Sequence, residues 1–232
     1  MRRTNVVASA LIFATLSVSA VPADEAKPAE SQQRAEKILA QTSGAEGIFA
    51  TTEDWSLKHV QSGLVCPLTF PNASLVRLYI YAPDGTDVGC DYARPATGKA
   101  VSKLTVFAVR TLEGETLDSI FAKYKGEVEG SMPSAKSRGP AIHFDGNNAK
   151  TKEMASIVRS EEYEVSMGGS NHISDLIVAL VGDWAIEIRA TFSATANNAV
   201  DLGGPALAMV QAIDSVMSEQ SGPKSGKNAP KE

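Results

Sequence analysis

The longest alternating apolar pattern in the chain spans residues 173–192 and predicts two strands joined by a tight turn at Gly182-Asp183. The cross-strand partners expected on one face are Val181 with Trp184, Ala179 with Ile186, and Ile177 with Ile188. The other face is apolar along the first strand, but the second strand carries Glu187 and Arg189 there. We therefore expect a central first strand, a half-solvated second strand, and a surface ion pair between Glu187 and Arg189.

Three segments have the spacing of amphipathic helices. Ser31 is a candidate N-cap for a short helix over residues 31–41. Thr116 is a candidate N-cap for a second helix, whose apolar positions are Leu117, Ile120, Phe121, Tyr124 and Val128. Pro205 suits the first turn of a third, largely apolar helix that runs to Ser218. We expect these helices to pack on a sheet.

Shorter apolar runs separated by turn residues predict the remaining strands. These are residues 64–66, 75–81, 100–110, 141–145 and 153–167, the last as a pair or as one bent strand. Residues 84–91, 131–140 and 168–172 are expected to form the loops that carry any function. The predicted fold class is α+β, an antiparallel β-sheet with an amphipathic helix and a C-terminal helix packed on it. This order of elements is similar to that of PsbP-like α/β/α sandwiches, a resemblance that implies no function.

The first residues indicate export. Arg2-Arg3 precedes an uncharged run from Val6 to Ala20, and small residues stand at Ala20 and Ala23. We expect residues 1–23 to be a signal peptide cleaved after Ala23, with Ala20 as the alternative. The rest divides into a leader with a short helix (24–44), one α+β domain (45–218) and a disordered tail (219–232). No transmembrane span is expected after the signal, and the predicted localisation is periplasmic or secreted.

The two cysteines of the chain, Cys66 and Cys90, are expected to form one structural disulfide. Their spacing is not the C-x-x-C of a redox or metal-binding pair. In the chain-entropy model, closing a loop of this length stabilises a fold by roughly 3 kcal/mol.

Charge and motifs narrow the class of function. The chain has a net charge of −5, and it becomes −7 without residues 1–23, which hold two Arg and no acidic residue. An acidic chain argues against nucleic acid as a partner. Fingerprints of serine hydrolases, zinc peptidases, phosphate loops and dinucleotide sites do not occur in the sequence. We expect no cofactor, no metal and no catalytic residue.

Several residues remain candidates for a binding site. Trp55, Tyr81, His143 and His172 are the speculative ligand-binding residues, because aromatic and imidazole side chains can line a cleft. His59 is the third histidine, and three histidines allow a metal site only if at least two converge. Asp84, Asp87 and Asp91 crowd one glycine-containing turn, which suits either Ca²⁺ or ordinary turn chemistry.

The sequence therefore favours an exported, non-catalytic binding or accessory factor of the cell envelope, with a small ligand or a protein as its partner. The first alternative is an exported hydrolase whose site is assembled from His143, His172 and nearby acids. The second is a structural partner of an envelope complex that docks through residues 131–140 or an acidic surface.

Overall fold

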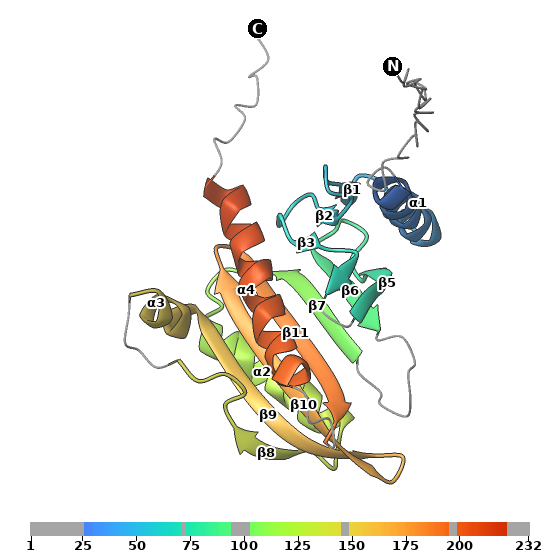
Figure 1. Cartoon of the computed structure of the whole chain (residues 1–232). Helices are drawn as coiled ribbons and strands as arrows, with labels where there is room; N and C mark the ends of the chain where they lie inside the picture. The colour runs from blue at the N-terminus through green and yellow to red at the C-terminus, as the bar shows by residue number, and fades with distance from the viewer. Residues whose placement is uncertain (1–25, 71–72, 94–102, 145–148, 195–198, 222–232) are drawn as a thin grey trace, which may run out of the picture.

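The computed structural model describes residues 26–70, 73–93, 103–144, 149–194 and 199–221. Its main element is an eight-stranded antiparallel sheet in the order β4-β5-β6-β7-β11-β10-β9-β8 (Figure 1). The strands are β4 (Thr69–Phe70), β5 (Ala73–Ile80), β6 (Asp87–Ala93), β7 (Lys103–Arg110), β8 (Lys136–Gly139), β9 (Val158–Met167), β10 (Ser170–Val181) and β11 (Trp184–Ser193). The predicted α+β class is confirmed, with helices on both faces of this sheet.

The hairpin of β10 and β11 has the register expected from the sequence, with Val181 opposite Trp184 and Ile177 opposite Ile188. Gly182 has a φ of +57° and Asp183 does not have a positive φ, which is the pattern of a type II′ turn. The expectation of a half-solvated second strand is wrong. β11 pairs with β7 on its other side, and Glu187 is 3% exposed.

Helix α2 (Leu117–Ser131) covers one half of one sheet face. Its N-cap is Thr116, as predicted, and the Thr116 and Ser119 side chains form a reciprocal capping box. The apolar stripe of α2 packs on β9, β10 and the start of β11. The residues of this smaller core are Leu117, Ile120, Tyr124, Val128, Tyr163, Val165, Leu176, Val178 and Ala185.

Helix α4 (Ala199–Ser221) lies across the opposite face and packs on β10 and β11 (Figure 1). It begins six residues before the expected Pro205. Near its C-terminal end, α4 lies very close to two glycines of other segments. A Cβ added to Gly182 would overlap the Gln220 side chain, and a Cβ added to Gly63 would overlap the Glu219 side chain. The Gln220 amide also donates to the Val181 carbonyl at 3.0 Å.

A three-stranded sheet and helix α1 complete this face. The small sheet has the order β1 (Phe49–Thr51), β2 (Leu57–His59) and β3 (Val65–Cys66). Helix α1 (Ala26–Gln41) starts five residues before the predicted Ser31 and buries Ala35 and Ile38 in the main core. Arg34 in this helix donates to the Leu75 carbonyl at 2.8 Å, so α1 is bound to β5.

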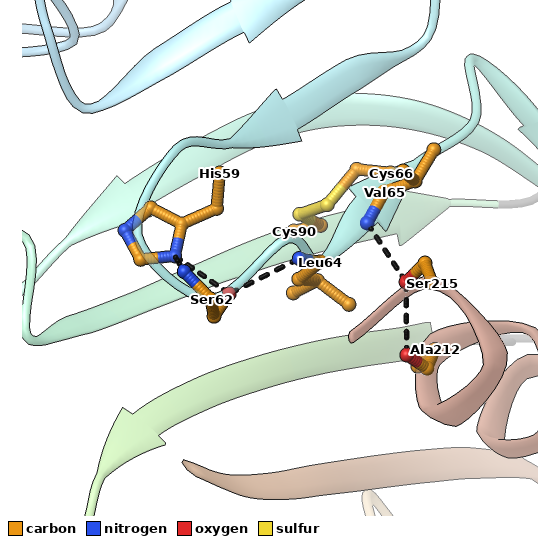
Figure 2. Close-up of a disulfide and its surroundings, with 8 residues drawn as sticks. All are labelled: His59, Ser62, Leu64, Val65, Cys66, Cys90, Ala212 and Ser215. Carbon is orange, nitrogen blue, oxygen red and sulfur yellow. Dashed lines mark hydrogen bonds between the residues drawn. A yellow bond between two sulfur atoms is a disulfide. The ribbon is translucent and has the colours of Figure 1, made fainter. Parts of the chain in front are cut away.

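The predicted disulfide between Cys66 and Cys90 is confirmed, and both residues are almost fully buried. It joins β3 of the small sheet to β6 of the large one, and so links two strands that are not paired (Figure 2). Beside it, the Val65 amide donates to Ser215 Oγ of α4 at 3.2 Å. The small sheet is therefore joined to the large sheet by a disulfide and to α4 by a hydrogen bond.

Several predicted loops and strands are wrong. From Asp87 onward, the expected 84–91 loop is strand β6, and β8 lies in the expected 131–140 loop. Residues 141–144 are not a strand, and 153–167 divides into helix α3 (Ala149–Ile157) and strand β9. The predicted signal peptide (1–23) and most of the predicted tail (219–232) lie outside the described part of the chain. Among the described helices, none is both long enough and apolar enough for a membrane span.

Candidate ligand-binding groove

The candidate site lies along the edge of α2, where the sheet face is no longer covered by this helix. On this face α2 packs on β9–β11 and leaves β6, β7 and the end of β5 uncovered. Tyr81, the residue that follows β5, is 56% exposed there. A groove of about 280 Å³ runs along the boundary between α2 and these strands. Its lining residues are Tyr81, Asp87, Phe107, Val109, Lys123, Tyr124, Glu127, Glu187 and Arg189.

The floor of the groove contains a buried carboxyl group. Glu187 projects from β11 and accepts a hydrogen bond from Arg189 Nε, two residues along the same strand face. Arg189 also donates to Glu127 Oε2 of α2 at 2.8 Å, so its guanidinium bridges strand and helix. Burial raises the pKa of Glu187 to about 7, against the opposing effect of Arg189. Glu187 is therefore partly protonated near neutral pH.

An aromatic row forms the wall of the groove. Tyr81 stacks on Tyr79, with ring centroids 5.4 Å apart, and lies 6.1 Å from Phe107. The Phe107 ring occupies the space above Gly89, because a Cβ added to Gly89 would lie 2.9 Å from it. Arg77 lies over the Tyr79 ring at 4.8 Å and Arg189 lies 5.8 Å from the Phe107 centroid. The row is thus flanked by a cation at each end.

The three aspartates considered for Ca²⁺ do not act together. Asp84 caps its own turn by accepting from the Thr86 amide at 3.1 Å. Asp91 is 4% exposed and accepts from Thr105 and Tyr79, each at 3.2 Å, with Arg77 at 3.5 Å. The described residues contain no group of three or more His, Cys, Asp or Glu that could hold a metal ion. Turn chemistry explains Asp84 and pairing with strand neighbours explains Asp91, while Asp87 lines the groove.

The structure places only one of the four speculative ligand-binding residues in the groove. Tyr81 lines it. Trp55 is half-buried against the core on the other side of the sheet, and has a positive φ of 63°. His143 is exposed between β8 and α3, while His172 is buried in β10 with its Nδ1 3.1 Å from the Ser170 carbonyl. These residues do not form one site.

His59 has a structural position in the small sheet. Its Nδ1 lies 2.7 Å from Ser62 Oγ (Figure 2). Its ring packs edge-on against Trp184, with centroids 5.4 Å apart. Burial lowers the pKa of His59 to about 4, so the imidazole is neutral at ordinary pH. The Leu64 amide donates to the same Ser62 hydroxyl at 3.1 Å, which fixes the turn between β2 and β3.

Sequence reasoning missed most of the groove. Asp87 and Phe107 belong to strands whose neighbours were not known, and Lys123 lies on the polar side of a helix. Glu187 and Arg189 did carry a signal, because two opposite charges two residues apart on a strand share one face. That pair predicts an ion pair but not the helix that buries it.

Two solved structures share a distant likeness with this chain. Protein of unknown function PA94 from Pseudomonas aeruginosa is 14% identical, covers 64% of this chain and 87% of its own, and has a TM-score of 0.32. A mutant of protein Mog1 is 8% identical, covers 73% of this chain and 86% of its own, and has a TM-score of 0.36. No protein-family model and no curated protein matches the chain. At such TM-scores the likenesses carry no argument about function.

Proposed function

We propose that the protein is an exported, non-catalytic binding domain, an accessory factor of the cell envelope that holds a small ligand in the groove between α2 and strands β5–β7. The observation that carries this proposal is the lining of the groove. Aromatic rings and a few charged groups converge where the sheet is left uncovered. Ligand sites generally combine such apolar walls with a small number of placed polar groups.

Two independent features support export. The basic start, apolar run and small-residue exit of residues 1–23 match a cleaved signal. The buried Cys66–Cys90 disulfide is typical of an oxidising compartment. Binding is preferred over the hydrolase alternative because His143 and His172, on which that alternative depends, lie outside the groove.

Export is tested by expressing the full chain in a bacterial host and sequencing the N-terminus of the protein found in the periplasm or medium. We expect Asp24 as the first residue, or Val21 if cleavage follows Ala20. Retention of residues 1–23 on protein that remains in the cytoplasm would contradict export.

Binding is tested by NMR titration of a fragment library into the exported protein. We expect ligands to shift amide resonances of the groove strands, and Tyr81→Ala to weaken those ligands by about tenfold through loss of stacking. The matched control is Leu112→Ala, because Leu112 is 74% exposed and lies outside the groove. Equal affinity for Tyr81→Ala and Leu112→Ala, or hits clustered elsewhere, would reject the groove as the site.

A further inference from the structure

One carboxyl group in the groove lacks a partner. Among the described residues, Glu187 and Glu127 both pair with Arg189, but the Asp87 side chain makes no ion pair within 4.0 Å and no hydrogen bond. Asp87 is half-buried, and burial raises its pKa, while Lys123 lowers it and Glu127 raises it further. A carboxylate in such a place gains free energy from any cation that reaches it.

Arg189 shows that the groove already accommodates a cation. Its guanidinium lies 5.8 Å from the Phe107 ring centroid and bridges the carboxyl groups of Glu187 and Glu127. An aromatic face combined with carboxylates is the arrangement that holds organic cations in proteins. One end of the groove thus satisfies this pairing from within the chain.

Beside Tyr81 the groove offers the same two groups, an aromatic ring and a carboxyl group, and among the described residues no cation forms an ion pair with this carboxyl group. Tyr81 is largely exposed, and its backbone amide donates to the Asp87 carbonyl at 2.9 Å, so the ring and the carboxylate belong to paired neighbours. Lys123 is the nearest competing cation, but its ammonium group lies 5.5 Å from the Tyr124 ring centroid and its side chain is exposed. A ligand cation can therefore displace Lys123 at little cost.

Building on the proposed binding function, we propose that the ligand is a small organic cation, whose protonated amine or guanidinium group is held by Asp87 and packs against Tyr81. Three carboxyl groups face two cations in the groove, and the whole chain has a net charge of −5, so the potential favours positive ligands. A groove of about 280 Å³ is near the lower limit for ligand sites, which fits a small molecule rather than a peptide.

The test uses three probes of one shape and different charge, namely benzylamine, benzyl alcohol and benzoate, titrated into the full exported protein at low salt and pH 8. We expect benzylamine to shift the resonances of Tyr81 and Asp87, and to bind at least about tenfold more tightly than benzyl alcohol, with benzoate weakest. Binding of benzylamine should weaken from pH 8 to pH 5. Glu187 has a pKa of about 7 and takes up a proton over this range, and burial raises the pKa of Asp87 as well. The charged and titratable groups that face them are Tyr81, Lys123, Tyr124, Glu127 and Arg189.

Variants separate the carboxylate from the ring. Asp87→Asn should reduce benzylamine affinity by about tenfold and leave benzyl alcohol unchanged, with Asp183→Asn, in the exposed hairpin turn, as the matched control. Lys123→Gln should increase benzylamine affinity, because it removes the competing cation. This gain cannot arise from misfolding, so it tests the proposal even if Asp87→Asn is unstable.

The outcomes distinguish the two proposals. If the three probes bind alike, Lys123→Gln gives no gain and Tyr81→Ala weakens all of them, the cation is rejected while the binding groove stands. If no probe or library fragment shifts a groove resonance, both proposals fail.

Discussion

The two faces of the eight-stranded sheet are built from the same strands but in different ways. On one face, α4, α1 and the small sheet cover residues from β5 to β11 in one large core. On the other face, α2 covers β9–β11 and leaves the ends of β5–β7 to a row of aromatic and charged side chains. Alternate residues of one strand serve both faces, as Cys90 and Asp91 do in β6.

This difference separates the face that carries the large apolar core from the face that carries the proposed binding groove. Apolar burial on the α4 face, together with a disulfide, stabilises the fold without help from the open half of the α2 face. The α2 face retains Glu187 and Asp91, buried carboxyl groups that cost free energy unless they are paired. The predictions below test this separation, starting with the largest expected effect.

Truncation of Ile186 should have the largest effect on stability. Ile186 is fully buried between β7 and β10 on the α4 face, so Ile186→Ala should lower the free energy of unfolding by about 4 kcal/mol in urea titrations. The matched change on the open face is Val109→Ala, which removes methyl groups from a half-buried groove residue and should cost less than about 1 kcal/mol. Similar losses at both sites would contradict the division between the faces.

Removal of the disulfide should have the next largest effect. The double change Cys66→Ala with Cys90→Ala should cost about 3 kcal/mol, because the unfolded chain regains the entropy of a loop with a sequence separation of 24. Denaturation of the unmodified chain with and without reductant should give the same difference. Mass spectrometry of exported protein should show one intramolecular bridge, and two free thiols would contradict it.

The Glu187→Gln change should remove the free-energy cost of ionising a buried carboxyl group, a cost that grows as pH rises. Because the folded-state pKa of Glu187 is raised to about 7 from 4.5, the folded state binds more protons than the unfolded state between these values. The stabilisation by protonated Glu187 is therefore lost as pH rises through 7. The stability of Glu187→Gln relative to the unmodified chain should increase by about 2 kcal/mol from pH 5 to pH 8.

Other titrating groups contribute equally to the stability of Glu187→Gln and of the unmodified chain, so their effects cancel in the difference. His59, with a pKa near 4, loses stabilisation as pH falls below 6.5, and Asp175, with a pKa near 7, loses it as pH rises. Both groups are present in each protein, so the difference between their unfolding curves isolates Glu187. The control Glu113→Gln removes an exposed carboxylate, and a difference curve of the same slope there would rule out the buried site as the cause.

The smallest effect is expected at the contact between α4 and the small sheet. Ser215→Ala leaves the Val65 amide without its acceptor and should cost about 1 kcal/mol. Ser218→Ala is the control in the same helix, because Ser218 is exposed and donates only to Asp214 of its own helix. Thermal melts should separate the two, and equal melting temperatures would show that the strand amide finds water instead.

The sequence predicted well where local chemistry determined the structure. The Gly182-Asp183 turn set the register of β10 and β11, and Thr116 set the start of α2. The sequence did not predict strand β6, because Asp and Gly are typical of turns and the residues that stabilise them in this strand belong to other strands. Arg77 and Lys103 lie within ion-pair distance of Asp91, and the Phe107 ring covers Gly89.

Of the groove residues, the sequence predicts Tyr81 as a ligand-binding residue and considers Asp87 only as a Ca²⁺ or turn residue. Glu187 was interpreted as solvated, because a strand pattern does not reveal which helix will lie above it. Residues 153–157, the second half of α3, are predicted as a strand, because the nine residues of this helix have little helical amphipathicity. These errors share one cause, which is that burial by distant segments leaves no local pattern.

The pairing of β7 with β11 is the seam between two meanders, β4–β7 and β8–β11, whose other neighbours are all close in sequence. The groove straddles this seam, with Asp87 and Phe107 contributed by the first meander and Glu187 and Arg189 by the second. Because the seam joins residues as far apart as Lys103 and Thr191, it closes the longest chain loop in the sheet. A ligand that contacts both meanders would bind only when β7 and β11 are paired, and it would therefore stabilise that pairing.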